Sequence, residues 1–256
     1  MRIIYNNLLD ALSSSSMLAS SYETSYPLTN AIDQRLTVKW QTEATTSATA
    51  VFDLGATTST TVFAVLGHDL ASGGTVTITG NNDIASGLTW TTSGESTTLT
   101  ITYNIGAMIY FPAAAMSYRY WKFSFSGQSE SGFSIGRLWI GNYLTVNPSS
   151  LDDFTVTKVR DDIVIYGKGR QKYSSVGNGW RKFELSFPKT SGTMLSSIQA
   201  LYDTVGKHTS FIFCNFDTSR SYDLVDPCYV SIQEDIGFSH RGRQQYTYGL
   251  ILEEDR

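Results

Sequence analysis

The chain has 256 residues, 41% of them hydrophobic, and a formal net charge of −4. This size predicts one or two folded domains, and the negative charge argues against sequence readout of nucleic acid or non-specific binding through a basic surface. No run approaches 18 consecutive apolar residues, so we expect no transmembrane helix. The first residues lack the long apolar core of a signal peptide, which predicts synthesis in a cytoplasm.

Composition favours strands and divides the chain. The sequence holds 15 Tyr and 13 Phe but 5 Pro, which is typical of β-rich proteins. Residues 1–150 contain 6 Lys/Arg and 9 Asp/Glu, whereas residues 151–256 contain 13 and 14. This shift predicts two domains, 1–150 and 151–256. Cys214 and Cys228 are expected to be buried thiols, with a disulfide as the alternative.

The first domain is predicted to contain many short strands. Residues 1–26 form either an extended arm or a first strand with a loose loop. Alternating or apolar runs between turn residues then predict strands at 50–52, 61–66, 75–80, 99–103, 108–111, 120–125 and 135–141. Close spacing of short strands indicates an all-β sandwich.

An ordered set of landmarks in this half resembles a discoidin-type domain, the galactose-binding-like jelly roll. The landmarks cover roughly residues 20–145 and are Tyr26-Pro27, Asn30–Asp33, Trp40, Asp53–Gly55, Arg119–Phe123 and Ile135–Gly141. The resemblance implies a core position for Trp40 and a structural calcium near Asp33. However, Gln34 replaces a usual glycine and Arg137 a frequent glutamate, and a cation there disfavours calcium. We therefore expect an Asp33–Arg137 ion pair, with no metal and no cofactor.

The same resemblance places ligands on loops at one end of the sandwich. The candidate ligand-binding residues in such loops are His68, Asp69, Asn81, Asn82, Asp83 and Trp90. A sugar site needs a flat aromatic face and a few polar groups, which these residues offer. The competing interpretation is structural, with His68 capping a turn and Trp90 packing on the sheet.

The second domain is predicted to combine strands with one helix. Residues 153–160 and 163–166 predict a hairpin, and the alternation from Gly179 to Pro188 predicts a half-buried strand. A helix is expected over 192–205, capped by Ser191 or Thr193 and followed by Gly206. Its apolar face includes Leu195, Ile198 and Leu201, and further strands are expected at 208–214, 228–232 and 245–252.

This pattern resembles the minor and distal tail (baseplate) proteins of tailed bacteriophages over residues 151–256. The matching segments are 179–187, 195–207, 211–213, 226–232 and 248–254. The resemblance implies a β-sandwich with one flanking helix that assembles into a homo-oligomeric ring. It also implies a virion structural protein of the tail, made in the host cytoplasm. The edges at 167–173 and 217–227 are candidate contacts between subunits.

The expected fold class is therefore mainly β: a discoidin-like jelly-roll sandwich followed by a β-sandwich with one flanking α-helix. In the leading interpretation the first domain attaches the tail protein to other phage tail proteins or to a host-surface glycan. The alternative is a carbohydrate-binding protein in which the first domain carries the function. A solution mass measurement separates a ring from a monomer.

Motifs for catalysis are not found in the sequence. There are three histidines, and neither a Gly-x-Ser-x-Gly elbow nor a His-Glu-x-x-His motif occurs. Asp161 and Asp162 are adjacent, so on a strand they point to opposite faces and cannot form a facing glycosidase pair. No His/Cys cluster predicts a metal site. We expect no enzyme activity and no catalytic residues.

Overall fold

The computed structural model describes residues 1–84, 88–90, 97–101, 107–128, 131–146, 153–166, 172–175, 177–214, 227–240 and 245–255. Within it the chain forms two compact units. Unit 1 consists of Met1–Tyr5 and Leu144–Arg256, and unit 2 of Asn6–Tyr143. The boundary predicted at 150/151 lies outside the described residues.

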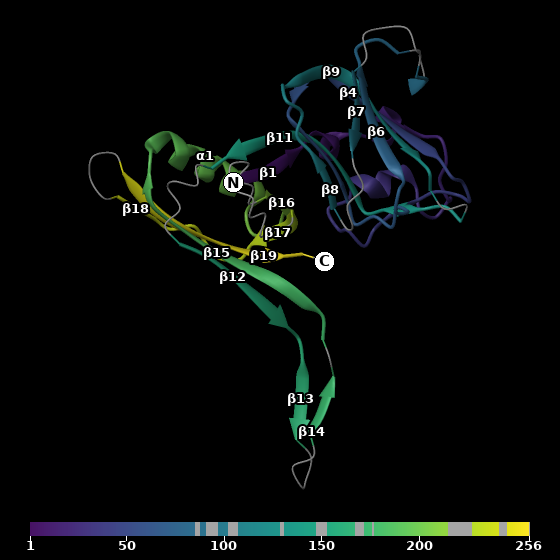
Figure 1. Ribbon diagram of the computed structural model, residues 1–256. Helices are drawn as coiled ribbons and strands as arrows, with labels where there is room; N and C mark the ends of the chain where they lie inside the picture. The colour runs from purple at the N-terminus through teal and green to yellow at the C-terminus, as the bar shows by residue number, and fades with distance from the viewer. Residues whose placement is uncertain are drawn as a thin grey trace. The chain divides into compact units, whose positions relative to one another are not determined.

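Unit 2 is a sandwich of two antiparallel sheets (Figure 1). One sheet has the order β2-β4-β9-β6-β7, and the other contains β11, β5 and β8 in that order. The strands of the first sheet are β2 (Met17–Ala19), β4 (Ala48–Thr60), β9 (Met116–Ser126), β6 (Thr75–Asn81) and β7 (Thr97–Ile101). Those of the second are β11 (Arg137–Thr145), β5 (Val62–Leu66) and β8 (Ala107–Tyr110). The remaining elements are the 3-10 helices η1 (Leu8–Ala11), η2 (Ser14–Ser16) and η3 (Leu28–Ile32) and the paired short strands β3 (Trp40–Gln41) and β10 (Ser134–Ile135).

The core of unit 2 lies between these sheets. Alternation along β9 turns Trp121, Phe123 and Phe125 inward, with 0%, 0% and 1% of each exposed. Trp40 is fully buried and meets Phe125 and Phe133 edge-on, at centroid distances of 5.7 and 6.0 Å. The prediction that Trp40 is a core residue is therefore confirmed.

The expected Asp33–Arg137 ion pair does not form. Asp33 binds Arg35, whose Nε and Nη2 donate to its two carboxylate oxygens at 3.0 and 2.9 Å. Arg137 Nη2 instead donates to both carboxylate oxygens of Asp10, at 2.8 and 2.7 Å. The guanidinium of Arg137 is fully buried and lies over the Trp139 ring, 4.8 Å from its centroid. Asp10 lies in η1, outside the discoidin landmarks, which is why they did not point to it.

The residues at the Asp33 turn do not fit a calcium ion. Calcium needs six to eight oxygen ligands with unengaged lone pairs. Hydrogen bonds from Arg35 occupy both oxygens of Asp33 and lower the pKa of this carboxyl, and the charge of Arg137 lowers it further. The Arg35 guanidinium is therefore already paired with the carboxylate at which calcium was considered.

Unit 1 is built on an antiparallel sheet of order β12-β15-β19-β17-β16-β1. Its strands are β12 (Asp153–Arg160), β15 (Gly179–Thr190), β19 (Tyr246–Glu254), β17 (Cys228–Ile232), β16 (Phe211–Cys214) and β1 (Arg2–Asn7), and β18 (Phe238–His240) pairs with β19. β1 completes the sheet from the far end of the sequence, because Ile3 pairs with Phe213 and both are fully buried. Residues 1–26 therefore begin with a strand.

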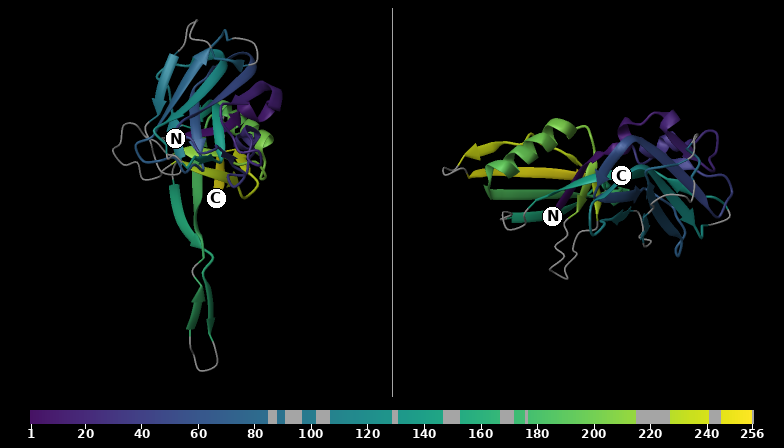
Figure 2. Two further views of the ribbon diagram at one scale, coloured as in Figure 1. Left: turned by 90° about the vertical axis from the view of Figure 1, so that its right-hand side faces the viewer. Right: turned by 90° about the horizontal axis from the view of Figure 1, so that it is seen from above.

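Helix α1 (Gly192–Val205) agrees with the predicted helix and lies over one face of the unit 1 sheet (Figure 2). The Ser191 side chain accepts a hydrogen bond from Met194 N, and Gly206 has a positive φ of 54°. Ile198 and Leu201 are fully buried, and Leu195 is partly buried, as the apolar stripe predicted.

The strand predicted to stop near Pro188 continues to Thr190. Its pairing with β19 is irregular between Phe187 and Thr190, and such a bulge accommodates a proline that cannot donate to the ladder. The alternation was correct: Phe183, Leu185 and Phe187 are 0%, 3% and 0% exposed.

The predicted hairpin of residues 153–160 with 163–166 is also wrong. β12 pairs with β15 along its whole length, whereas β13 (Ile163–Tyr166) pairs with β14 (Lys172–Ser175). Asp161 N donates to Asn178 O, so Asp161-Asp162 continues the strand direction rather than reversing it. The four strands together make a long two-stranded arm extending from unit 1, which we call the arm (Figure 1).

The two cysteines lie on neighbouring strands of unit 1. Both are buried, and Cys228 pairs in register with Phe213, the residue before Cys214. Burial raises the pKa of the Cys214 thiol to about 12, so it stays protonated at neutral pH. A thiol held in this form is a small core side chain and a poor nucleophile.

Candidate functional site

The candidate site lies on the outer face of the five-stranded sheet of unit 2. Because side chains alternate along β9, Tyr120, Lys122 and Ser124 point away from the core, and each is partly exposed. In register, Tyr120 pairs with Asp53 of β4 and with Asn81 of β6. These three strands thus bring polar and aromatic side chains from distant parts of the sequence to one surface.

Trp90 covers part of this face. The Lys122 ammonium lies 4.6 Å from the centroid of the Trp90 ring, a cation–π contact. Thr79, which pairs directly with Lys122, is 8% exposed, so this part of the outer face is shielded from water. Burial lowers the pKa of Lys122. Trp90 thus lies against the Lys122 ammonium on the outer face of the sheet, and the residue is partly exposed.

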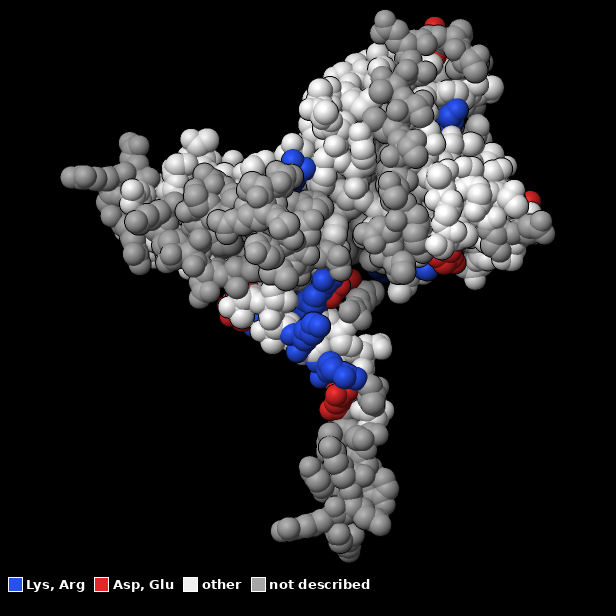
Figure 3. Space-filling view, viewed as in Figure 1, with Lys and Arg blue, Asp and Glu red and all other residues white. Residues whose placement is uncertain are grey.

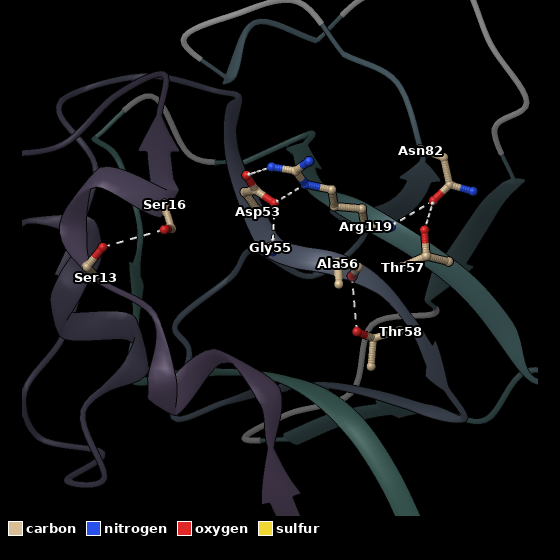
Figure 4. A network of polar contacts seen from close by, with 9 residues as sticks. All are labelled: Ser13, Ser16, Asp53, Gly55, Ala56, Thr57, Thr58, Asn82 and Arg119. Carbon is tan, nitrogen blue, oxygen red and sulfur yellow. Dashed lines mark hydrogen bonds and ion pairs between the residues drawn. The ribbon is translucent and has the colours of Figure 1, made fainter.

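A polar network borders the aromatic surface (Figure 4). Arg119 Nε and Nη2 donate to the two carboxylate oxygens of Asp53, each at 2.7 Å. The Arg119 backbone N and Thr57 Oγ1 both donate to Asn82 Oδ1, at 2.9 and 3.1 Å. The guanidinium of Arg119 also lies 4.7 Å from the centroid of the Tyr120 ring.

An irregularity in β4 makes this network possible. Pairing of β4 with β9 shifts between Asp53 and Thr58, and Gly55 has a φ of 78°. Asp53 Oδ1 accepts from Gly55 N at 2.7 Å, which fixes the bulge. The hydrogen bonds from Arg119 lower the pKa of Asp53, so the pair stays ionised at neutral pH.

Five of the six predicted ligand residues fall into two groups, and the sixth, Trp90, lies against Lys122 as described above. Asn81 is the last residue of β6, Asn82 and Asp83 follow it next to Arg119, and Asn81 Oδ1 accepts from Asp83 N at 3.0 Å. His68 and Asp69 precede β6 instead, and Asp69 accepts from Ser134 N and Oγ at 2.6 and 2.7 Å. The length of β6 separates the two groups by roughly 20 Å at ~3.3 Å per residue. The structure does not bring them together.

Sequence reasoning did not assign Tyr120, Lys122, Asp53 or Arg119 to the site. In the sequence analysis these four residues were named only within the landmark segments Asp53–Gly55 and Arg119–Phe123. The alternation of Arg119-Tyr120-Trp121-Lys122 was a usable signal, since it places Tyr120 and Lys122 on the face opposite the core tryptophan.

Unit 1 contains a cavity of about 350 Å³, which is the alternative site. It is lined by Asn178, Gly179, Trp180, Gln233, Glu253, Glu254 and Asp255. Arg181 donates to Glu254 at 2.9 and 3.1 Å, and Ser210 and Ser231 donate to Asp255. Two of its three carboxylates are therefore already bound within the protein, so the face around Trp90 and Lys122 is the better candidate.

Among the described residues, no group of three or more His, Cys, Asp or Glu side chains is arranged to hold a metal ion. A search of the same residues found no helix with the length and apolar character needed to cross a membrane.

Several solved structures are similar to part of the chain. A mutant of chitosan-binding module 1 from a chitosanase/glucanase of Paenibacillus sp. IK-5 is 16% identical with a TM-score of 0.42, over 55% of this chain and 99% of that one. The family 32 carbohydrate-binding module of NanJ from C. perfringens is 18% identical with a TM-score of 0.41, over 56% of this chain and 100% of that one. The lectin domain of lectinolysin is 13% identical with a TM-score of 0.41, over 54% and 96%.

No protein-family model matches the chain, and no curated protein matches it. Each of the three similar structures covers just over half of this chain. The part of the chain that the structure describes is mainly β with one α-helix.

Proposed function

We propose that unit 2 binds a carbohydrate on the outer face of its five-stranded sheet. The observation that carries this proposal is the position of Trp90. This partly exposed residue lies against Lys122, which is two residues from Tyr120 on the same face of β9. A flat aromatic surface bordered by fixed hydrogen-bonding groups suits a sugar ring, which has apolar faces and a polar rim. Asn82 and Asp83 are exposed at this border.

The proposed role is binding without catalysis. Asp53, the carboxylate nearest Tyr120 in register, is engaged by both donors of the Arg119 fork. A general acid or a nucleophile needs a carboxyl group that can exchange protons or attack, and this pairing opposes both. The proposal is therefore of a binding module.

Replacing Trp90 by alanine is expected to lower glycan affinity about tenfold or more, or ~1.4 kcal/mol, because the stacking surface is lost. Binding is measured on a glycan array and then by calorimetry with the best ligand. Tyr26→Ala is the matched control, since Tyr26 is an exposed aromatic residue (44%) elsewhere in unit 2.

Equal affinity of the Trp90→Ala variant and the wild type would place the glycan elsewhere. If the folded wild-type protein binds no glycan on the array, the proposed function is wrong.

A second candidate function is assembly into a phage tail through unit 1, and the arm favours it. β12 is the end strand of its sheet among the described residues, and Val156 and Ile165 are 39% and 60% exposed. Figure 3 shows basic side chains gathered along the arm, where Lys158 and Arg160 are exposed. Long open edges with apolar side chains favour pairing with another chain. We propose a homo-oligomeric ring in the virion tail, with further tail proteins as neighbours.

The subunit edges expected at 167–173 and 217–227 lie largely outside the described residues, so Val156 provides the test. Val156→Lys is expected to shift the protein to a monomer in analytical ultracentrifugation, because a charge opposes close packing at the edge. Thr155→Lys adds the same charge on the opposite face of β12 and should assemble. A wild-type protein that remains monomeric at all concentrations excludes the ring.

A further inference from the structure

The cations of unit 2 differ in how they are neutralised. Its five Lys and Arg residues are Arg35, Lys39, Arg119, Lys122 and Arg137. Each of the three arginines forms an ion pair, with Asp33, Asp53 and Asp10 in chain order. No ion pair joins Lys122 to any described residue, and its recorded contact is the face of the Trp90 ring. Lys122 is thus a cation of the candidate site that no described carboxylate pairs with.

The surroundings of Lys122 make this position costly. Its cross-strand neighbours Val51 and Thr79 are 4% and 8% exposed, so water reaches this part of the sheet poorly. Moving an ammonium out of water carries a free-energy penalty, and the cation–π contact with Trp90 offsets only part of it. Burial lowers the pKa of Lys122, as expected for an ammonium that is partly removed from water. An anion that contacts the ammonium would remove the remaining penalty.

None of the carboxylates that the structure describes, Asp53 and the exposed Asp83 included, forms an ion pair with Lys122. Asp53 is directed to Arg119 by two hydrogen bonds of 2.7 Å, so its charge is already balanced. Asn82 contributes an amide, and its Oδ1 accepts from Arg119 N and Thr57 Oγ1. Among the described residues of this surface, Lys122 is therefore the cation that lacks an ion pair, and its ammonium lies against the aromatic ring on which a sugar would stack.

We propose that the glycan bound at this face is anionic, with a carboxylate, phosphate or sulfate substituent that pairs with Lys122 while its sugar ring stacks on Trp90. The inference rests on the proposed function and makes it more specific. A charge-assisted hydrogen bond in a poorly hydrated place discriminates strongly against the same sugar without its charge. All three substituents carry a negative charge on oxygen atoms that can accept a hydrogen bond from the ammonium. The matched ligand pairs described next distinguish among them.

The test compares matched ligand pairs on the full chain: oligogalacturonate against its methyl ester, a phosphorylated glycan against its dephosphorylated form, and a sulfated glycan against its desulfated form. We expect at least one charged member to bind roughly tenfold more tightly than its neutral partner. Lys122→Met, which keeps the apolar stem, is expected to abolish that preference. Lys158→Met, in unit 1, is the control and should retain it. Lys122→Gln provides a second variant if Lys122→Met does not fold.

The wild type alone gives an independent readout. The affinity for the charged ligand should fall as the pH rises through the pKa of Lys122, which lies below the usual 10.5 of lysine, because the neutral amine no longer pairs with the anion. The neutral partner should show no such change. All three kinds of substituent stay ionised over this range, so the titrating group belongs to the protein.

Each alternative outcome is decisive. Equal affinity for the charged and neutral members overturns the anionic inference and leaves carbohydrate binding intact. A preference that survives in a folded Lys122→Met protein also overturns it, because another cation is then responsible. If no glycan of either kind binds, the proposed function fails and this inference fails with it.

Discussion

Replacing Leu201 by aspartate is expected to unfold unit 1 while unit 2 stays folded. Leu201 is fully buried in α1, with Ile198 and Val205 on the same stripe. Removing a leucine from such a site costs about 2–5 kcal/mol, and an unpaired buried carboxylate adds to that cost. The sum is comparable to the whole stability of a typical domain, ~5–15 kcal/mol. Limited proteolysis should then digest unit 1 and leave a resistant fragment close to Asn6–Tyr143.

Gln199→Asp is the matched control, because Gln199 is exposed on the same helix. It introduces the same charge without burying it and should change the proteolysis pattern little. If the Leu201→Asp protein resists protease as the wild type does, the apolar stripe of α1 does not hold unit 1 together. If it also assembles normally, the proposed ring does not depend on unit 1.

Removing Asp10 is expected to destabilise unit 2 more than removing its partner Arg137. The Arg137 side chain is fully buried, whereas 34% of the Asp10 side chain is exposed. Asp10→Ala deprives a buried guanidinium of its carboxylate, a change that typically costs about 3–5 kcal/mol. Arg137→Met leaves a carboxylate that water can reach and keeps an apolar stem against Trp139, so its cost should be smaller.

Urea unfolding measures both costs, and the double variant Asp10→Leu/Arg137→Met completes the design. Burial raises the pKa of Asp10 more than Arg137 lowers it, which indicates that the ion pair only partly offsets its desolvation. The double variant should therefore be close to the wild type in stability. A double variant as unstable as Asp10→Ala would show that the pair itself stabilises unit 2.

Local patterns in the sequence predicted the elements of the fold well. Period and capping defined α1, since Ser191 and Gly206 fix its ends through short-range geometry. Alternation predicted which side of β15 faces the core, because the pleat repeats every two residues. The core position of Trp40 followed from its place among the discoidin landmarks.

Pairings between distant segments were harder to predict. Nothing local in Arg2–Asn7 indicates that it pairs with Phe211–Cys214, because any apolar strand of similar length could. The same limit applies to Arg137, whose partner Asp10 is 127 residues away. In the site, Asn82 was predicted as a loop residue, whereas the contact of Trp90 with Lys122 depends on tertiary packing.

The pairing of β1 with β16 has a consequence for the order of folding during synthesis. All of unit 2 is made between the first strand of unit 1 and the remaining strands of that unit. At ~5–20 residues per second, β1 waits at least about ten seconds for Phe211–Cys214 to emerge, long enough for unit 2 to fold first. Unit 2 is thus an insertion in unit 1, and its compact fold shortens the loop that unit 1 must close.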